Sequence, residues 1–335
     1  MSELYEHHDL ALKELQSFIQ LAEVNDNING KVQILACIVQ FISFELFRGG
    51  ASIAWELHLQ AGASLAPELT THMPLISNNL TTTLDATATA ISFMCGVILW
   101  FDILSTITTG KKTLLHAHRE VILAVIHIDN ITGCRNWVVS RIDEISDLAA
   151  RQSVEIITDQ EFWEINAQAQ QIMERLKTGL QTTKVEGDAL KEHNSVRSAA
   201  DFTCFIACIS TQVYAAAALV FVQVTIFRGY LNSTDLRSYV SQTISALKDI
   251  PEPQMTRSFI WPLVIAGCMA SEAEYAFFES KFLQIGKAGL AFGNSSQSLA
   301  LLRKCWQLRS TSDSQALSVD WRHAMSALQV RVLCV

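Results

Sequence analysis

Apolar residues recur at intervals of three and four along most of this chain, which is the spacing of amphipathic helices. No segment shows the strict alternation of a half-buried strand. Proline is scarce, with five residues, and glycine is modest, with 14, so helices can run long. The sequence predicts an all-α fold of about 10–13 helices, near residues 2–24, 30–48, 51–64, 80–108, 114–131, 134–151, 159–180, 195–229, 233–249, 257–286, 294–308 and 313–330.

The segment from Phe202 to Phe227 contains no charged residue. Thr, Ser and Gln side chains interrupt it, and no positively charged flank marks a cytoplasmic side. A helix that is apolar all round is expected at the centre of a large helical protein, so we predict a buried central helix and no membrane span. The polar stretch 181–194 is predicted to be a surface loop, and residues 1–335 a single domain.

Composition narrows the classes of function. Of the 335 residues, 50% are hydrophobic and 17% are charged, which is typical of a protein with a large core. The formal net charge is −8, with 25 Lys and Arg against 33 Asp and Glu, and there is no basic arm, so direct nucleic-acid binding is not expected. The eight cysteines lie mostly in apolar runs, without zinc spacing, which indicates a reducing intracellular setting.

Asn136, Ser140 and Glu144 follow one another at intervals of four, a spacing that keeps three oxygen-bearing side chains on one helix face. Such a set can hold Mg²⁺, which prefers oxygen ligands and leaves positions open for phosphates. Asp102 and Asp129 each follow a long apolar run and are candidates for further Mg²⁺ ligands. The alternative is a solvated helix face for the first three, and capping or ion pairing for the two aspartates.

Cations and aromatic residues could complete a site for a phosphorylated substrate. Arg48, Arg135, Arg228 and Lys248 lie at the ends of apolar stretches, where they could neutralise a diphosphate or, alternatively, pair with carboxylates. Trp100 is one of seven tryptophans, whose faces can stabilise a carbocation or simply fill the core.

Four runs carry a resemblance to a known family: WFDILSTITTG (100–110), GCRNWVVSRIDEISDLA (133–149), WPLVIAGC (261–268) and DWRHAM (320–325). They resemble the helical regulatory domain of fungal zinc-cluster transcription factors, best from residue 44 to the end. That family's DNA-binding module begins with a CxxC pair, and this sequence contains no CxxC. The resemblance therefore implies a regulatory domain without its DNA-binding module.

Within that resemblance, the chain is also similar to fungal humulene-forming terpene cyclases. The Asn136, Ser140 and Glu144 spacing and the overlapping Asp143-Glu144-x-x-Asp147 resemble their metal-binding motifs. This implies a cytoplasmic sesquiterpene cyclase, a lyase that ionises farnesyl diphosphate with Mg²⁺.

On the cyclase hypothesis, Lys248 and Arg135 neutralise the departing diphosphate, with Lys281 and Lys287 as other candidates for the lysine. Ile244, Arg48, Arg228 and Trp100 then contact substrate. The alternative hypothesis is a nuclear regulatory domain that acts through protein partners or a small-molecule effector.

Overall fold

The structure is a computed structural model that describes residues 2–25, 27–49, 54–73, 82–153, 158–192, 199–228, 233–287, 293–311 and 319–335. These residues form fourteen α-helices and one 3₁₀ helix, and none of them is in a strand, so the predicted all-α class is confirmed. The bounds are α1 Ser2–Asn25, α2 Ile28–Arg48, α3 Ala54–Thr71, α5 Thr82–Thr109, α6 Arg119–Val125, α7 Asp129–Thr132, α8 Asn136–Gln152, α9 Asp159–Glu192, α10 Ala199–Thr225, α11 Thr234–Lys248, η1 Pro253–Phe259, α12 Ile260–Cys268, α13 Glu272–Lys287, α14 Gly293–Thr311 and α15 Trp321–Leu328.

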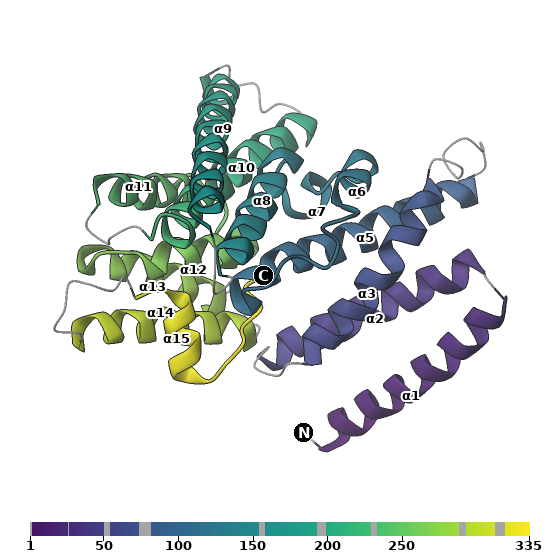
Figure 1. Cartoon of the computed structure of the whole chain (residues 1–335). Coiled ribbons are helices and arrows are strands. Elements are labelled where there is room, and N and C mark those ends of the chain that lie inside the picture. Colours follow the sequence, from purple (N-terminus) through teal and green to yellow (C-terminus); the bar gives the residue numbers. More distant parts are fainter. Residues whose placement is uncertain are drawn as a thin grey trace.

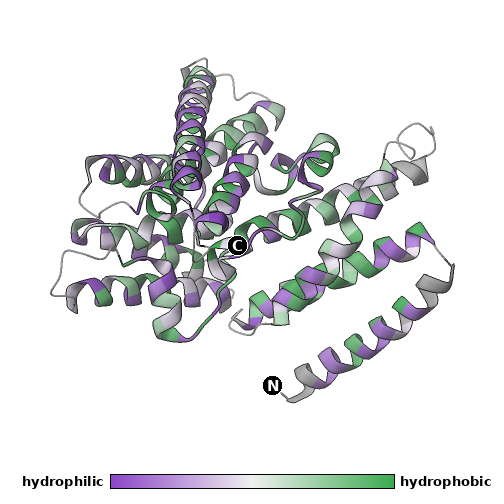
Figure 2. Ribbon diagram, in the orientation of Figure 1, coloured by the Kyte–Doolittle hydropathy of each residue, from purple (hydrophilic) through white to green (hydrophobic). Residues whose placement is uncertain are grey.

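The helices form two groups that meet along α5 (Figure 1). Helices α1, α2 and α3 lie on one side of α5, and α8 to α15 lie on the other. Helix α10 packs against α8, α9, α11 and α12, so it occupies the centre of the larger group. Figure 2 shows hydrophilic and hydrophobic residues alternating along α1 and α9, as expected for helices with one face toward solvent.

The predicted buried central helix is confirmed in α10. Every residue from Val213 to Val222 is buried, and the hydroxyl of Tyr214 donates a 2.7 Å hydrogen bond to the carbonyl of Ser258. All nine residues of α12 are also buried. These two helices belong to one continuous apolar cluster that extends through α2, α3, α5 and α14. The core therefore lies between the two groups as well as within each.

The prediction that no segment could span a membrane is not supported. Three described helical stretches are long and apolar enough to cross a bilayer by length and composition, namely Ile28–Arg48, Ala86–Thr109 and Ala200–Thr225. In the folded chain, 50%, 72% and 78% of their most apolar windows are buried. Composition cannot separate such helices from membrane spans, because both bury apolar side chains.

Helix α9 corrects the predicted loop at 181–194, because residues 181–192 continue the helix. Tertiary packing extends it: Thr183 is buried, and Gly187 lies so close to α10 that an added Cβ would be 3.2 Å from Nε2 of Gln212. Of the other residues in 181–191, all but the half-buried Leu190 are exposed, which explains their polar composition.

Two long predicted helices are broken. The segment 114–131 forms the short helices α6 and α7, joined by turns. The segment 257–286 is divided into η1, α12 and α13, with a break at Met269–Ser271. Side chains from α14 satisfy carbonyls at this break: Trp306 donates to Gly267, at 2.9 Å, and Arg309 donates to Ala270, at 3.3 Å. The predicted helix at 313–330 is described only as α15, because residues 312–318 lie outside the described residues.

The segment 331–335 runs between the two groups of helices. Its carbonyls accept hydrogen bonds from Trp55 on α3, Thr108 on α5 and Asn294 on α14. Residues 332–334 are fully buried. This segment therefore connects the early and late parts of the chain.

Candidate functional site: the α8–α9 surface

Asn136 is the first residue of α8, and its side-chain amide is fully used within the fold. Its Oδ1 accepts a hydrogen bond from the backbone N–H of Ile128, at 2.9 Å. Its Nδ2 donates to the carbonyls of Leu123, at 3.2 Å, and Ile126, at 2.8 Å. This amide therefore holds the turn between α6 and α7 against the start of α8, with both Nδ2 protons donated and one hydrogen bond accepted by Oδ1.

Ser140 and Glu144 continue along α8 but do not gather with Asn136 around a common point. Ser140 donates to the carbonyl of Asn136, at 3.2 Å. Glu144 pairs with Arg141, at 2.9 Å, and burial raises its pKa, although the positive charge of Arg141 opposes that rise. Among the described residues, no three His, Cys, Asp or Glu side chains come close enough to hold a metal ion. Binding of Mg²⁺ stays a prediction that no observation tests.

The two buried aspartates of this region are tied to the segment before α6. Asp102 is 1% exposed, and its two oxygens accept the backbone N–H groups of Leu114, at 2.9 Å, and Leu115, at 2.8 Å. Burial raises the pKa of Asp102 to about 6 despite these two hydrogen bonds. Asp143 is equally buried and accepts hydrogen bonds from Thr113, at 2.7 Å, and Arg119.

Asp129 lies apart, in the first turn of α7. Its Oδ1 lies 4.0 Å from Nδ1 of His127 and accepts no hydrogen bond.

The predicted cations do not converge. Arg135 pairs with Glu186 of α9, at 2.6 Å, beside α8. Lys248, at the far end of α11, lies 5.8 Å from the ring centroid of Phe277. Arg48 pairs with Glu45 at the end of α2. These three groups therefore lie at the ends of different helices, each with its own partner.

The other candidate residues are equally dispersed. Arg228 is exposed after α10, with a positive φ of 47°. Ile244 packs against the core from α11, and Trp100 is buried on α5 with its ring edge-on to Tyr214. Lys281 donates to the carbonyl of Leu247, at 3.1 Å, and the side chain of Lys287 lies outside the described residues.

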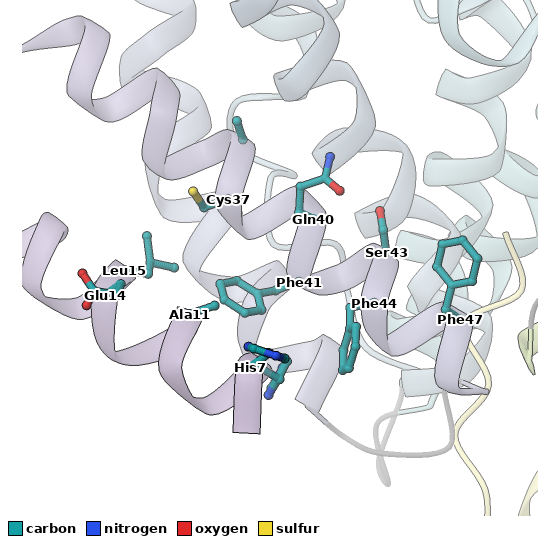
Figure 3. A pocket seen from close by; sticks show the side chains of 12 residues that line it. His7, Ala11, Glu14, Leu15, Cys37, Gln40, Phe41, Ser43, Phe44 and Phe47 are labelled. Carbon is teal, nitrogen blue, oxygen red and sulfur yellow. The ribbon is translucent and has the colours of Figure 1, made fainter. Parts of the chain in front are cut away.

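A large apolar groove lies between α1 and α2 (Figure 3). Its volume is about 890 Å³, and Leu15 of α1 and Phe41, Phe44 and Phe47 of α2 supply much of its lining. The ring of His8 stacks on Phe44 with the centroids 4.7 Å apart. The groove offers apolar contact surface and few polar groups.

Two charged hollows lie side by side on the α8–α9 surface and share Arg175. The first, which we call the arginine hollow, has a volume of about 500 Å³ and is lined by Arg135, Trp137, Arg141, Arg175, Gly179, Thr182 and Thr183. The second, which we call the His116 hollow, has a volume of about 200 Å³ and is lined by His116, Arg119, Glu144, Asp147, Leu148, Gln168, Gln171, Ile172 and Arg175. Glu144 and Arg135 are therefore the two predicted site residues that do lie beside a hollow.

Sequence reasoning missed Arg141 and Arg175 as site residues. The available signal was spacing: Trp137 and Arg141 are four residues apart on α8, and so are Arg175 and Gly179 on α9. The two pairs face each other across the contact between α8 and α9. Residue spacing cannot predict this contact, because it depends on tertiary packing.

Comparison with known proteins agrees with one of the two hypotheses. A family model described as the fungal specific transcription factor domain matches residues 1–335. The chain is 27% identical over 349 residues to a trichothecene biosynthesis transcription regulator of Trichoderma arundinaceum, covering 92% of this chain and 76% of that protein. It is 25% identical to a transcription factor of Nectria sp and 24% identical to one of Pestalotiopsis microspora. The chain spans 53% and 56% of the lengths of these two relatives. No solved structure matches.

These matches overturn the cyclase hypothesis. The prediction of a magnesium-dependent sesquiterpene cyclase, with farnesyl diphosphate as its partner, is wrong, because the family and the relatives named here are transcription regulators. The resemblance to terpene cyclases is not supported, and neither is the cytoplasmic location inferred from it. The sequence runs that resembled both families are accounted for by the transcription factor family alone. This chain belongs to the fungal specific transcription factor domain family.

Proposed function

We propose that this chain is the regulatory domain of a transcription regulator that controls genes for a secondary metabolite, and that it acts in the nucleus. The observation on which this rests is the match of the transcription factor domain to the whole chain. The names of the relatives support the choice of target genes, since they include regulators of trichothecene biosynthesis and of a pestheic acid cluster.

The geometry supports a regulatory function over catalysis. Carbocation chemistry requires a dry, enclosed cavity beside a metal cluster. Here the amide of Asn136 is engaged in three backbone hydrogen bonds, and Glu144 is paired with Arg141. The hollows beside these residues lie at the surface between helices, where an effector could enter without opening the core.

We assign the regulatory input to a small-molecule effector. The α8–α9 surface offers three guanidinium groups, of which those of Arg135 and Arg141 are half-buried, an indole ring and two threonines within one hollow of about 500 Å³. Ligand sites commonly have volumes of about 300–1,000 Å³ and combine apolar walls with a few polar groups.

The test is deletion of the gene in the source organism, followed by RNA sequencing under conditions in which secondary metabolites are made. We expect the transcripts of one co-located set of biosynthetic genes to fall about ten-fold, and reintroduction of the gene to restore them. A fluorescent fusion should accumulate in the nucleus. Unchanged transcripts of every biosynthetic gene set would reject the proposal.

A matched control separates regulation from metal-dependent catalysis. The Ser140→Ala variant removes a hydroxyl expected to hold Mg²⁺, and Ser140 lines neither of the two charged hollows. It should restore transcription as the unaltered gene does. Loss of restoration by a folded Ser140→Ala protein would mean that the hydroxyl itself is needed, and would count against the regulatory assignment.

A further inference from the structure

The arginine hollow contains more positive charge than its own carboxylates neutralise. Arg135 pairs with Glu186, at 2.6 Å, and Arg141 pairs with Glu144, at 2.9 Å. Within the part of the chain that the structure describes, Arg175 forms no ion pair. One positive charge is therefore left over at the edge shared by the two hollows, which matches a ligand with one negative charge.

The neighbouring His116 hollow does not supply the missing negative charge. Arg119 contacts Asp143 and, at 3.9 Å, the exposed Glu120, and Lys112 pairs with Asp147, at 3.1 Å. The carboxylates of this hollow are thus engaged by other cations, and among the described residues Arg175 remains the lining cation without an ion pair. A dianion such as phosphate would reverse this balance, whereas a single carboxylate would complete it.

A buried donor of Arg141 has no acceptor. The side chain of Arg141 is 18% exposed, and its Nη1 is buried without a hydrogen-bond partner. A buried unsatisfied donor of a charged group is costly, so native sites seldom leave one without a ligand or water. The fork of a guanidinium is matched by the two oxygens of a carboxylate, and a rotation of the Arg141 side chain toward the hollow would bring Nη1 to such an acceptor while Nη2 stays paired with Glu144.

The electrostatic field around Arg141 agrees with this geometry. Burial lowers the pKa of Arg141, and the nearby cations Arg175 and Arg119 lower it further, against the opposing effect of Glu144. The guanidinium groups therefore repel one another in a partly desolvated place. An anion between them would relieve that repulsion.

The wall of the hollow next to these arginines is aromatic. Trp137 lies one turn before Arg141 on α8, and its six-membered ring packs on α9 at Gly179. An added Cβ at Gly179 would lie 2.5, 2.7 and 2.8 Å from three atoms of that ring, so only glycine leaves room for the indole here. The ring thus lies against the α9 backbone and lines the hollow beside the arginines, so that an aromatic ligand in the hollow would contact it.

We propose that the arginine hollow binds a small aromatic carboxylic acid, with Arg141 and Arg175 holding the carboxylate and Trp137 contacting the ring. This assignment rests on the proposed regulatory function for its biological meaning, since it names the chemical class of the effector. The binding itself is a property of the folded chain and can be measured alone.

The experiment uses the full chain and 4-fluorobenzoate as the probe, observed by fluorine NMR. We expect the probe signal to broaden on addition of protein, with a dissociation constant of about 1 mM or tighter for so small a ligand. Unlabelled benzoate should displace the probe. Benzamide, which has the same ring without the charge, should not displace the probe. Acetate lacks the ring and inorganic phosphate carries a different charge, so each should compete at least ten-fold more weakly than benzoate.

Two variants and one matched control locate the site. Arg175→Gln removes the unpaired cation from an exposed position and should weaken binding about ten-fold. Arg141→Lys keeps the charge beside Glu144 but loses the fork, and should also weaken binding. Lys177→Gln removes a cation from another face of the same helix, where it pairs with Glu174, and should leave binding unchanged.

Three results would overturn the assignment: no broadening of the probe, equal competition by benzoate, acetate and phosphate, or equal effects of Arg175→Gln and Lys177→Gln. The second and third would mean adventitious anion binding only. None of these results bears on the transcript measurement, so the site and the regulatory function can fail separately. If gene deletion leaves transcripts unchanged while 4-fluorobenzoate still binds through Arg175, the binding site is supported and the proposed regulatory function is rejected.

Discussion

The buried carboxylate of Asp102 should make the stability of this fold depend on pH in a way that one substitution removes. Burial, opposed by the N–H groups of Leu114 and Leu115 and increased by the charge of Asp143, raises the pKa of Asp102 from its ordinary 3.8 to about 6 in the folded chain. In the unfolded chain the carboxyl is solvated and titrates near 3.8. Between these values the folded state binds more protons than the unfolded state.

The sign and size of the effect follow from linkage. Because the folded-state pKa is raised, the contribution of Asp102 favours folding at low pH and is lost as pH rises from about 4 to about 6. A rise from 3.8 to about 6 corresponds to about 3 kcal/mol of unfolding free energy. Since Asp102 is 1% exposed, solvent screening reduces this figure little.

The assay compares urea unfolding of the wild-type chain and Asp102→Asn at pH 4, 5, 6 and 7. Asparagine can accept only one of the two backbone N–H groups, so the variant loses an additional amount of unfolding free energy that does not depend on pH. Over this range the difference in unfolding free energy should shift by about 2.4 kcal/mol, with the variant gaining on the wild type as pH rises. Other titrating groups cancel in the difference if they do not contact Asp102.

The control is Asp188→Asn, which replaces an exposed carboxylate on α9. Its difference from the wild type should shift much less over the same range. A difference for Asp102→Asn that is independent of pH, or that shifts in the opposite direction, would refute the argument that burial outweighs the two hydrogen bonds.

Four further substitutions, of which Gly286→Ala is a control, test the packing between α12 and α15 by urea unfolding. Arg309→Met should lower the unfolding free energy by about 2–4 kcal/mol, because it strands the buried carbonyls at the α12–α13 break, and an unchanged midpoint would contradict that role. Gly267→Ala should lower the unfolding free energy by about 1–3 kcal/mol, since its Cβ would lie 2.7 Å from a methyl group of Leu302. The Cβ of Gly286→Ala meets no atom within 4 Å, so this variant should raise the unfolding free energy by about 0.5–1 kcal/mol. Equal effects of the two variants would refute the packing argument. Asp320→Ala removes the α15 cap and should cost about 1–2 kcal/mol at pH 7, and because the pKa of Asp320 is lowered to about 2, that cost should shrink as pH falls below 4; a constant cost would contradict it.

Helical periodicity was sufficient to predict the fold class and the central helix. The uncharged stretch within α10 has the composition of a helix buried on all sides, and the structure confirms that burial. The extension of α9 to Glu192 could not be predicted in the same way, because the contact of Gly187 with α10 joins residues that are distant in sequence. The break at Met269–Ser271 likewise depends on Arg309, 38 or more positions away.

The candidate site was predictable only in part. The sequence placed Asn136, Ser140 and Glu144 along one side of α8, but spacing alone could not show that the amide of Asn136 is directed toward backbone groups of the α6–α7 segment. Oxygen-bearing residues at intervals of four serve a metal site and a helix–loop contact equally well. The deciding information was the identity of each partner, which only the three-dimensional arrangement contains.

The contacts of segment 331–335 have a consequence for how the chain reaches its native state. Trp55 and Arg331 are joined across 276 positions, and Thr108 and Val332 across 224. Contacts between such distant positions close large loops, and proteins rich in them fold slowly. On the ribosome, α2 and α3 can pack on each other and on α5 early, whereas the contact of Trp55 on α3 with Arg331 can form only after residues 331–335 have been made. Production of the protein should profit from slow synthesis at low temperature and from chaperones that shield those helices in the meantime.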